Sequence, residues 1–307
     1  MKYDIGCDDD MLVGIIGGGS IGLLFGAYLG QEHPVTLFTK REEQAQGIKK
    51  NGIFLYSPEK EGRAVQVNAS FEKESLTEQD VIIVAVKQYD MPELKPLLLS
   101  IPKHIPLCFV QNGMGHLDML HGLPHETIIV ATVEHGAKRL DDQSVSHNGA
   151  GRTNLALFKG HANLPEIFPQ CTDPHFPVTV HNDYYTMMIE KLVANALINP
   201  LTVVFRVKNG RLVENPYYYA ILKLMFEEIY SIFPSGNKEQ SFDQVLRICT
   251  NTKNNTSSML SDIQAGRKTE IDAILGYILK VAERKGVKLQ TVQMIYVMVK
   301  GIVLERS

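Results

Sequence analysis

A lysine and two asparagines recur at intervals of four residues in an otherwise apolar stretch. Lys191, Asn195 and Asn199 lie within residues 187–200, where apolar residues follow helical spacing and predict a buried helix. The spacing places the three polar side chains on one slowly drifting stripe beside the apolar face. Unpaired burial would be costly, so either a polar ligand in a cleft or solvent must partner them, and periodicity alone favours neither. Pro200 predicts a kink where the stripe ends.

A glycine-rich loop near the N-terminus suggests a second kind of chemistry. The apolar run 12–16 leads into glycines at the positions of a G-x-G-x-x-G fingerprint. In a strand–turn–helix unit such a loop binds a pyrophosphate at the helix N-terminus. A structural turn without a ligand is the alternative, but the helical pattern at 23–29 and the strand pattern at 35–38 favour a dinucleotide site. The residues expected to contact the cofactor are Gly17, Gly18, Gly19, Ser20, Ile21 and Gly22.

A basic pair follows the second predicted strand. Many NAD-binding folds offer an acidic residue to the ribose 2′-hydroxyl at this place, whereas this chain has Lys40 and Arg41. Both can hold a 2′-phosphate by charge-assisted hydrogen bonds, which indicates NADP as the cofactor. The alternative is a solvated helix start over residues 40–43.

Two further candidates stand at the ends of buried strands. The β-branched run 80–86 is typical of a central parallel strand and is followed by Lys87, and the run 107–110 is followed closely by Asn112. Ligands of open α/β sheets gather beyond the carboxyl ends of strands, so both side chains are expected at the cofactor crevice. The pair Asn112-Gly113 is also an ordinary turn signal. Short strands are expected at 53–55, 65–67, 127–133, 155–157 and 178–180, with a polar turn at 57–62.

Composition and length limit the class of protein. The 307 residues, 44% of them hydrophobic, favour two domains, and a net charge of −3 gives no reason to expect nucleic acid or a membrane as partner. Four widely spaced cysteines favour neither zinc nor disulfides, and no metal site is predicted. The sequence shows no apolar run of about 18–20 residues and no signal peptide, so a cytoplasmic protein is expected. Residues 1–10 are interpreted as a leader or disordered extension.

Helical patterns dominate after residue 183, which divides the chain into an α/β domain at 11–183 and a helical domain at 184–307. Helices are predicted at 218–233 and 256–263. A further helix should begin with Thr269 as N-cap and end at Gly286. Glu270 in its first turn has a simple account, since acidic residues there complement the helix dipole.

The combination resembles the ketopantoate reductase (2-dehydropantoate 2-reductase) family from residue 11 nearly to the C-terminus. The resemblance rests on the order and spacing of motifs: the loop 17–22, Val86-Lys87, 112–115, 191–202, Asn209-Gly210, 257–260 and 269–272. It implies an N-terminal Rossmann domain followed by an all-helical domain like that of 6-phosphogluconate dehydrogenase. It also implies reduction of 2-dehydropantoate to (R)-pantoate by NADPH, on the route to pantothenate and coenzyme A.

The resemblance also implies roles for individual residues. Lys191 matches the catalytic lysine, and we expect it to polarise the 2-oxo group and act as general acid. The expected substrate-binding residues are Asn195, Asn199, Asn209 and Ser258. Those expected to contact cofactor or order the active site are Lys87, Asn112, Ala137 and Glu270, where Glu270 either positions Lys191 or holds the nicotinamide ribose.

Three other functions are compatible with parts of the pattern. A reductase of another branched 2-keto acid would keep every motif. A non-catalytic NADPH sensor would not need Lys191 and its stripe, and a 6-phosphogluconate-type dehydrogenase would need more basic residues for a substrate phosphate. The apolar segment 292–303 fits either a core or a dimer face, and because relatives are often dimers, a homodimer is expected.

Overall fold

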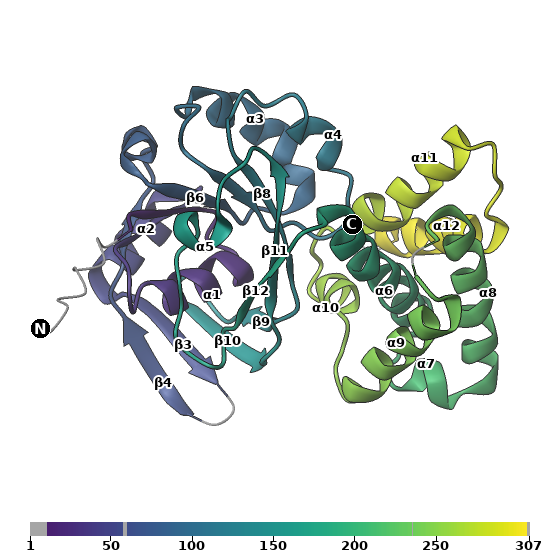
Figure 1. Cartoon of the computed structure of the whole chain (residues 1–307). Coiled ribbons are helices and arrows are strands. Elements are labelled where there is room, and N and C mark those ends of the chain that lie inside the picture. The colour runs from purple at the N-terminus through teal and green to yellow at the C-terminus, as the bar shows by residue number, and fades with distance from the viewer. Residues whose placement is uncertain (1–10, 58–59, 235, 306–307) are drawn as a thin grey trace, which may run out of the picture. The chain divides into compact units, whose positions relative to one another are not determined.

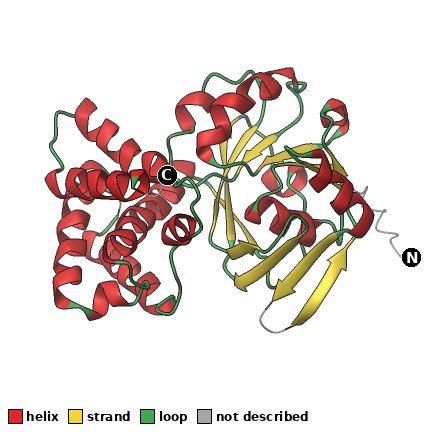
Figure 2. Cartoon of the chain, turned by 180° about the vertical axis from the view of Figure 1, so that it is seen from behind, coloured by secondary structure: helices red, strands yellow, loops and turns green. Residues whose placement is uncertain are grey.

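The structure is a computed structural model that describes residues 11–57, 60–234 and 236–305. The chain divides into two compact units. The first comprises the chain up to Val86, Asp90–Gln111 and Gly122–Tyr184, and the second comprises Lys87–Tyr89, Asn112–His121 and the chain from Tyr185 onward. Strands and helices build the first unit, and helices build the second (Figures 1 and 2). The expected leader at 1–10 lies outside the described residues.

Within the described residues, the main sheet of the first unit has eight strands in the order β12-β11-β8-β7-β6-β1-β2-β5. The strands are β1 (Val13–Ile16), β2 (Val35–Phe38), β5 (Asn68–Ser70), β6 (Val81–Val84), β7 (Leu107–Phe109), β8 (Ile128–Val133), β11 (Thr153–Lys159) and β12 (Val178–His181). Six of them, β5-β2-β1-β6-β7-β8, pair in parallel, which is the order of a doubly wound dinucleotide-binding sheet. The predicted Rossmann-type class of this half is therefore confirmed.

Burial explains the strength of the strand signals. Every residue of β1 and β6 is buried, as expected for central strands covered on both faces. Helices α1 (Ser20–Leu29), α2 (Glu42–Asn51) and α3 (Met91–Ser100) follow β1, β2 and β6 along the chain. The crossover from β1 through α1 to β2 thereby places the glycine loop at the carboxyl end of β1, where such sheets bind nucleotides.

A smaller sheet completes the first unit (Figure 1). Its order is β4-β3-β10-β9, from β3 (Ile53–Ser57), β4 (Lys60–Val65), β9 (Gly136–Arg139) and β10 (Ser144–Gly149). Helix α1 packs against strands of both sheets. The antiparallel strands β3 and β4 are joined within the predicted turn 57–62, of which residues 58–59 lie outside the described residues. The strand predicted at 65–67 is wrong, because β4 covers Lys60–Val65. The strands β9 and β10 had no counterpart among the predicted elements.

The second unit consists of helices. They are α4 (Leu117–Leu120), α6 (Tyr184–Phe205), α7 (Arg211–Glu214), α8 (Pro216–Ile232), α9 (Lys238–Asn251), α10 (Ser258–Gln264), α11 (Tyr277–Arg284) and α12 (Gln290–Leu304). A π-helical turn at Asp272–Gly276 leads into α11. Helix α8 packs against α7, α11 and α12. Its buried residues, which include Leu222, Phe226 and Ile229, form part of the helical core.

Helix α6 differs from its prediction in two respects. The helix does not end near Pro200 but continues through it to Phe205. In this last part the hydroxyl of Thr202 donates to the backbone carbonyl of Asn199 at 2.8 Å. The helix is also long and apolar enough to span a membrane by length and composition, contrary to the prediction that the chain has no such segment. However, 72% of the most apolar 18-residue stretch of this helix is buried inside the structure, as expected for a core helix.

Candidate active site

The glycine loop between β1 and α1 is a tight turn that needs its glycines. Gly17 has a φ of 116°, and a Cβ at Gly22 would lie 1.8 Å from the carbonyl oxygen of Gly17. Gly19, in contrast, has nothing within 4 Å of its Cβ position and is the N-cap of α1 without a side-chain cap. Open space beside uncapped N–H groups fits a bound pyrophosphate.

The other loop residues are partly engaged. The carbonyl of Gly18 accepts hydrogen bonds from Gln44 Nε2 at 2.9 Å and from Arg139 Nη1 at 3.2 Å. The hydroxyl of Ser20 accepts from the backbone N–H of Arg139 at 3.1 Å. Ile21 is half-buried and packs against the core of the first unit. Arg139, at the end of β9, is thus a neighbour of the loop that sequence reasoning missed.

The basic pair lies at the start of α2, and its two members differ. Arg41 is the N-cap residue of α2 and forms an ion pair with Asp142. This hydrogen bond from Arg41 keeps the pKa of Asp142 below its ordinary value. Lys40 lies 3.7 Å from Glu93, and both side chains are largely exposed, at 86% and 78%. Arg41 is therefore held in one place, while Lys40 is a solvated charge.

Ala137 lies on β9 opposite His147 of β10 and packs partly buried against the core of the first unit. Behind it, the Tyr28 hydroxyl is 2.7 Å from His147 Nδ1, and His147 Nε2 is 3.2 Å from His135 Nδ1. Phe176 stacks on both Tyr28 and His135. Burial lowers the pKa of His147, so the ring is neutral at pH 7. This packed cluster fixes the strand that carries Ala137.

In the second unit, Lys87 and Asn112 meet at Glu270. Lys87 Nζ lies 2.9 Å and Asn112 Nδ2 lies 3.0 Å from the same oxygen, Oε2 of Glu270. The Glu270 side chain is only 6% exposed. Lys87 also lies 3.6 Å from Asp262, whose other oxygen accepts from Arg267 Nε at 2.9 Å. Burial lowers the pKa of Lys87, but the charges of Glu270 and Asp262 outweigh it and raise the pKa, so Lys87 is a cation.

This arrangement corrects the predicted helix start. The helix begins at Ile271, with Ala273 N–H and Ile274 N–H donating to the carbonyl of Glu270, so Thr269 is not its N-cap. Glu270 therefore precedes the first turn and is the buried partner of an ion pair with the half-exposed Lys87.

The turn signal after Asn112 has a clear structural reason. Gly113 has a φ of 77°, and a Cβ there would lie 2.3 Å from the carbonyl oxygen of Ala273 in the π-helical turn. The turn thus lets the backbone approach that helix and brings Asn112 to Glu270. The predicted turn is confirmed, and the role of Asn112 as a site residue stays a prediction. A π-helical turn at such a place is common near functional sites.

The polar stripe lies on α6 as predicted. Lys191 and Asn195 are half-buried and Asn199 is buried, at 7% exposure. Below the stripe, the Thr202 hydroxyl is 2.7 Å from the hydroxyl of Ser257, which caps α10 by accepting from Leu260 N–H. Ser258 is the next residue and lies exposed in the first turn of α10.

Asn209 is buried between two segments. Its Nδ2 donates to Thr252 Oγ1 at 2.9 Å, and its backbone N–H donates to the carbonyl of Asn255 at 3.1 Å. Its Oδ1 is buried and has no hydrogen-bond partner among the described residues. The side chain is therefore fixed by the fold, with one buried acceptor that no described residue satisfies.

The sequence analysis did not predict two residues of the candidate site, Asp262 and Arg139, and the sequence pattern around each one indicates it only weakly. Asp262 interrupts the buried face formed by Met259, Leu260 and Ile263 of α10, which points to a polar partner. Arg139 follows two residues after Ala137, and its partners Gly18 and Ser20 are more than one hundred positions away, at 121 and 119 residues. Local patterns cannot reveal such partners.

Comparison with known proteins identifies the family. The profile of ketopantoate reductase PanE/ApbA matches residues 13–160, and the profile of its C-terminal part matches residues 183–303. The chain is 40% identical to 2-dehydropantoate 2-reductase of Listeria monocytogenes, over 96% of this chain and 97% of that protein. It is 39% identical to 2-dehydropantoate 2-reductase of Bacillus subtilis, over 97% and 98%. The crystal structure of a probable 2-dehydropantoate 2-reductase from Bacillus subtilis matches with a TM-score of 0.86 at 38% identity, covering 95% of this chain and 100% of that one. The chain belongs to the ketopantoate reductase PanE/ApbA family.

Proposed function

We propose that the chain catalyses the NADPH-dependent reduction of 2-dehydropantoate to (R)-pantoate, a step toward pantothenate and coenzyme A. One observation carries the proposal: a chain that matches 2-dehydropantoate 2-reductases over nearly its whole length presents Lys191, Asn195 and Asn199 along one helix. A single ammonium group on a stripe of amides is what a 2-oxo acid requires, because its reduction places negative charge on one oxygen.

The residues of the second unit would bind and protonate the substrate. NADPH supplies the hydride that reduces the 2-oxo carbon. Lys191 polarises the carbonyl and donates a proton to the oxygen as it becomes an alkoxide. Asn195 and Asn199 orient the polar groups of the substrate, and Ser258 binds its carboxylate or hydroxyl. Asn209 contributes its unpartnered Oδ1 as an acceptor for a substrate hydroxyl.

The other expected site residues would bind the cofactor. In the first unit, the loop Gly17 to Gly22 holds the pyrophosphate, with space above Gly19, and Lys40 and Arg41 hold the 2′-phosphate. Ala137 lines the site beside the loop. In the second unit, Glu270 orders Lys87 and Asn112 through one carboxylate oxygen, and these three residues would contact the cofactor or order the active site.

The test follows NADPH absorbance with a panel of 2-oxo acids and with NADH as the second cofactor. We expect turnover of 2-dehydropantoate with NADPH to exceed that of every other acid. Faster turnover of another branched 2-oxo acid would reassign the substrate, and NADPH binding without turnover of any acid would favour a sensor. Lys191→Met should abolish most turnover, whereas Lys223→Met, which removes an exposed lysine of α8, is the matched control.

Domain limits, assembly and location complete the proposal. We assign residues 11–183 to the NADP-binding domain and 184–307 to the substrate domain. A homodimer is supported by apolar side chains exposed on α12, among them Val297 at 56%, and light scattering of the purified protein would test it. A cytoplasmic location is supported by Cys108, Cys171 and Cys249, which are free thiols. Cell fractionation would test it.

A further inference from the structure

Two arginines of the first unit converge on one carboxylate oxygen beside the glycine loop. Arg41 Nη2 and Arg139 Nη2 both contact Oδ1 of Asp142. Arg139 also donates to the carbonyl of Gly18 and, through its backbone, to the hydroxyl of Ser20. Its guanidinium therefore lies between the phosphate-binding loop and the basic start of α2.

Arg41 and Arg139 share the carboxylate of Asp142, and Glu43 is a further carboxylate that acts electrostatically on Arg41. Two guanidinium groups face one carboxylate, and the three side chains are 50%, 35% and 36% exposed, so an anion from solvent can reach them. The planar fork of a guanidinium matches the oxygens of a phosphate. A phosphate monoester carries about −1.5 to −2 charges and three acceptor oxygens, and it can satisfy both arginines where Asp142 satisfies them with one oxygen.

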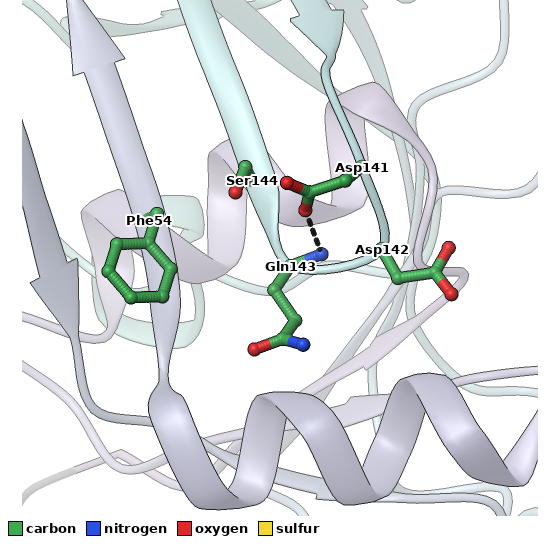
Figure 3. A pocket seen from close by; sticks show the side chains of 5 residues that line it. All are labelled: Phe54, Asp141, Asp142, Gln143 and Ser144. Atoms are coloured by element: carbon green, nitrogen blue, oxygen red, sulfur yellow. Dashed lines mark hydrogen bonds between the residues drawn. The ribbon is translucent and has the colours of Figure 1, made fainter.

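The turn that carries Asp142 is anchored on one side and open on the other. Asp141 accepts a hydrogen bond from Gln143 N–H at 2.8 Å, and Gln44 donates to the backbone carbonyl of Asp142 at 2.8 Å. Figure 3 shows the side chain of Asp142 directed away from Phe54. The other side of the turn borders a pocket of about 450 Å³ lined by Phe54, Asp141, Asp142, Gln143 and Ser144. The turn therefore has space in which to shift.

We propose that Arg139 is a second specificity-determining residue for NADPH, which binds the 2′-phosphate together with Arg41. Asp142 competes with that phosphate for both guanidinium groups and so limits the preference for NADPH over NADH. This inference rests on the proposed NADPH dependence and adds two residues to it. Lys40, which is solvated and faces Glu93, contributes less than Arg139 does.

The test measures binding of two probes by calorimetry, 2′,5′-ADP and 5′-AMP, which differ only in the 2′-phosphate. Arg139→Gln should weaken 2′,5′-ADP on the order of tenfold and leave 5′-AMP unchanged, because one charge-assisted contact is lost. Lys138→Gln, which removes the exposed neighbouring charge on β9, should change neither affinity appreciably.

Asp142→Asn supplies a second variant that misfolding cannot imitate, since it should gain affinity. We expect 2′,5′-ADP to bind several-fold tighter at low ionic strength, with 5′-AMP unchanged and with added salt narrowing the gain. Asp141→Asn, on the same turn with the same change of charge, is the matched control. If Asp142→Asn binds 2′,5′-ADP no tighter than the parent does, the proposed competition is wrong.

Equal losses of both probes in Arg139→Gln would show that Arg139 supports the glycine loop, and the proposal would be wrong. The parent protein separates this failure from failure of the proposed function. If the parent binds 2′,5′-ADP no tighter than 5′-AMP, the NADPH dependence itself is wrong. If the parent prefers 2′,5′-ADP and Arg139→Gln keeps that preference, only the role of Arg139 is wrong.

Discussion

Replacement of Glu270 by glutamine should destabilise the helical unit by about 1–3 kcal/mol. At 2.9 Å, the attraction between Lys87 and Glu270 is about 6 kcal/mol at an effective dielectric constant of 20, before desolvation is counted. Lys87 is 40% exposed and keeps Asp262 at 3.6 Å, so the loss must be smaller than the roughly 3–5 kcal/mol of a fully buried pair. Glutamine retains an acceptor oxygen for Asn112, which limits the effect to the lost charge.

Differential scanning calorimetry measures this change as a shift in Tm. At about 3 °C per kcal/mol, the expected decrease is about 3–9 °C. Asp118→Asn is the matched control, because it removes a carboxylate whose partner, Arg284, is 3.6 Å away with both side chains about two-thirds exposed, at 71% and 66%. An exposed pair contributes at most about 1 kcal/mol. A shift in Glu270→Gln no larger than that of Asp118→Asn would refute the buried-pair reasoning.

Three further predictions concern the site and the pH dependence of stability. Lys191→Ala should fold and bind NADPH but lose turnover by about 10² to 10⁴, and stopped-flow rates within threefold of the parent would remove it from the mechanism. Gly19→Ala should keep the Tm of the parent, because the added Cβ enters open space, but it should lose NADPH affinity in fluorescence titration, because the Cβ occupies the space proposed for the pyrophosphate. Gly22→Ala should lower the Tm, because its Cβ meets the carbonyl oxygen of Gly17. Burial lowers the pKa of His116 from 6.5 to about 4, so the unfolded chain binds more protons in this range. The neutral His116 therefore destabilises nothing above pH 6.5, but the free energy of unfolding should fall by up to about 3 kcal/mol as the pH decreases from 6.5 toward 4. His116→Leu should flatten this part of the curve of Tm against pH.

The strands with the clearest apolar runs are those whose burial is uniform. Strands β1 and β6 are buried along their whole length, so their apolar runs identify them. Strand β9, in contrast, alternates between exposed and half-buried residues, and its sequence Gly-Ala-Lys-Arg has no apolar run. Its place is decided by pairing with β10, which no local pattern contains.

Long-range partners also explain the errors at the site. Thr269 has the chemistry of an N-cap, but Glu270 is held by Lys87 and Asn112, which lie 183 and 158 residues earlier in the chain. The helix begins at Ile271, directly after this contact residue. On α6 the spacing of Lys191, Asn195 and Asn199 placed the stripe correctly, because a helical period is a local property. Their burial, and the continuation of the helix past Pro200, depend on packing.

The short segments Lys87–Tyr89 and Asn112–His121 belong to the helical unit although they come from the first half of the chain. This interleaving affects recombination between relatives. A chimera with a single crossover near residue 183 exchanges Glu270 without exchanging Lys87 and Asn112, so it combines one parent's buried carboxylate with the other parent's donors. Crossovers that transfer all three segments together keep each carboxylate with the ammonium and amide groups of its own parent, and libraries of hybrid reductases should be divided there.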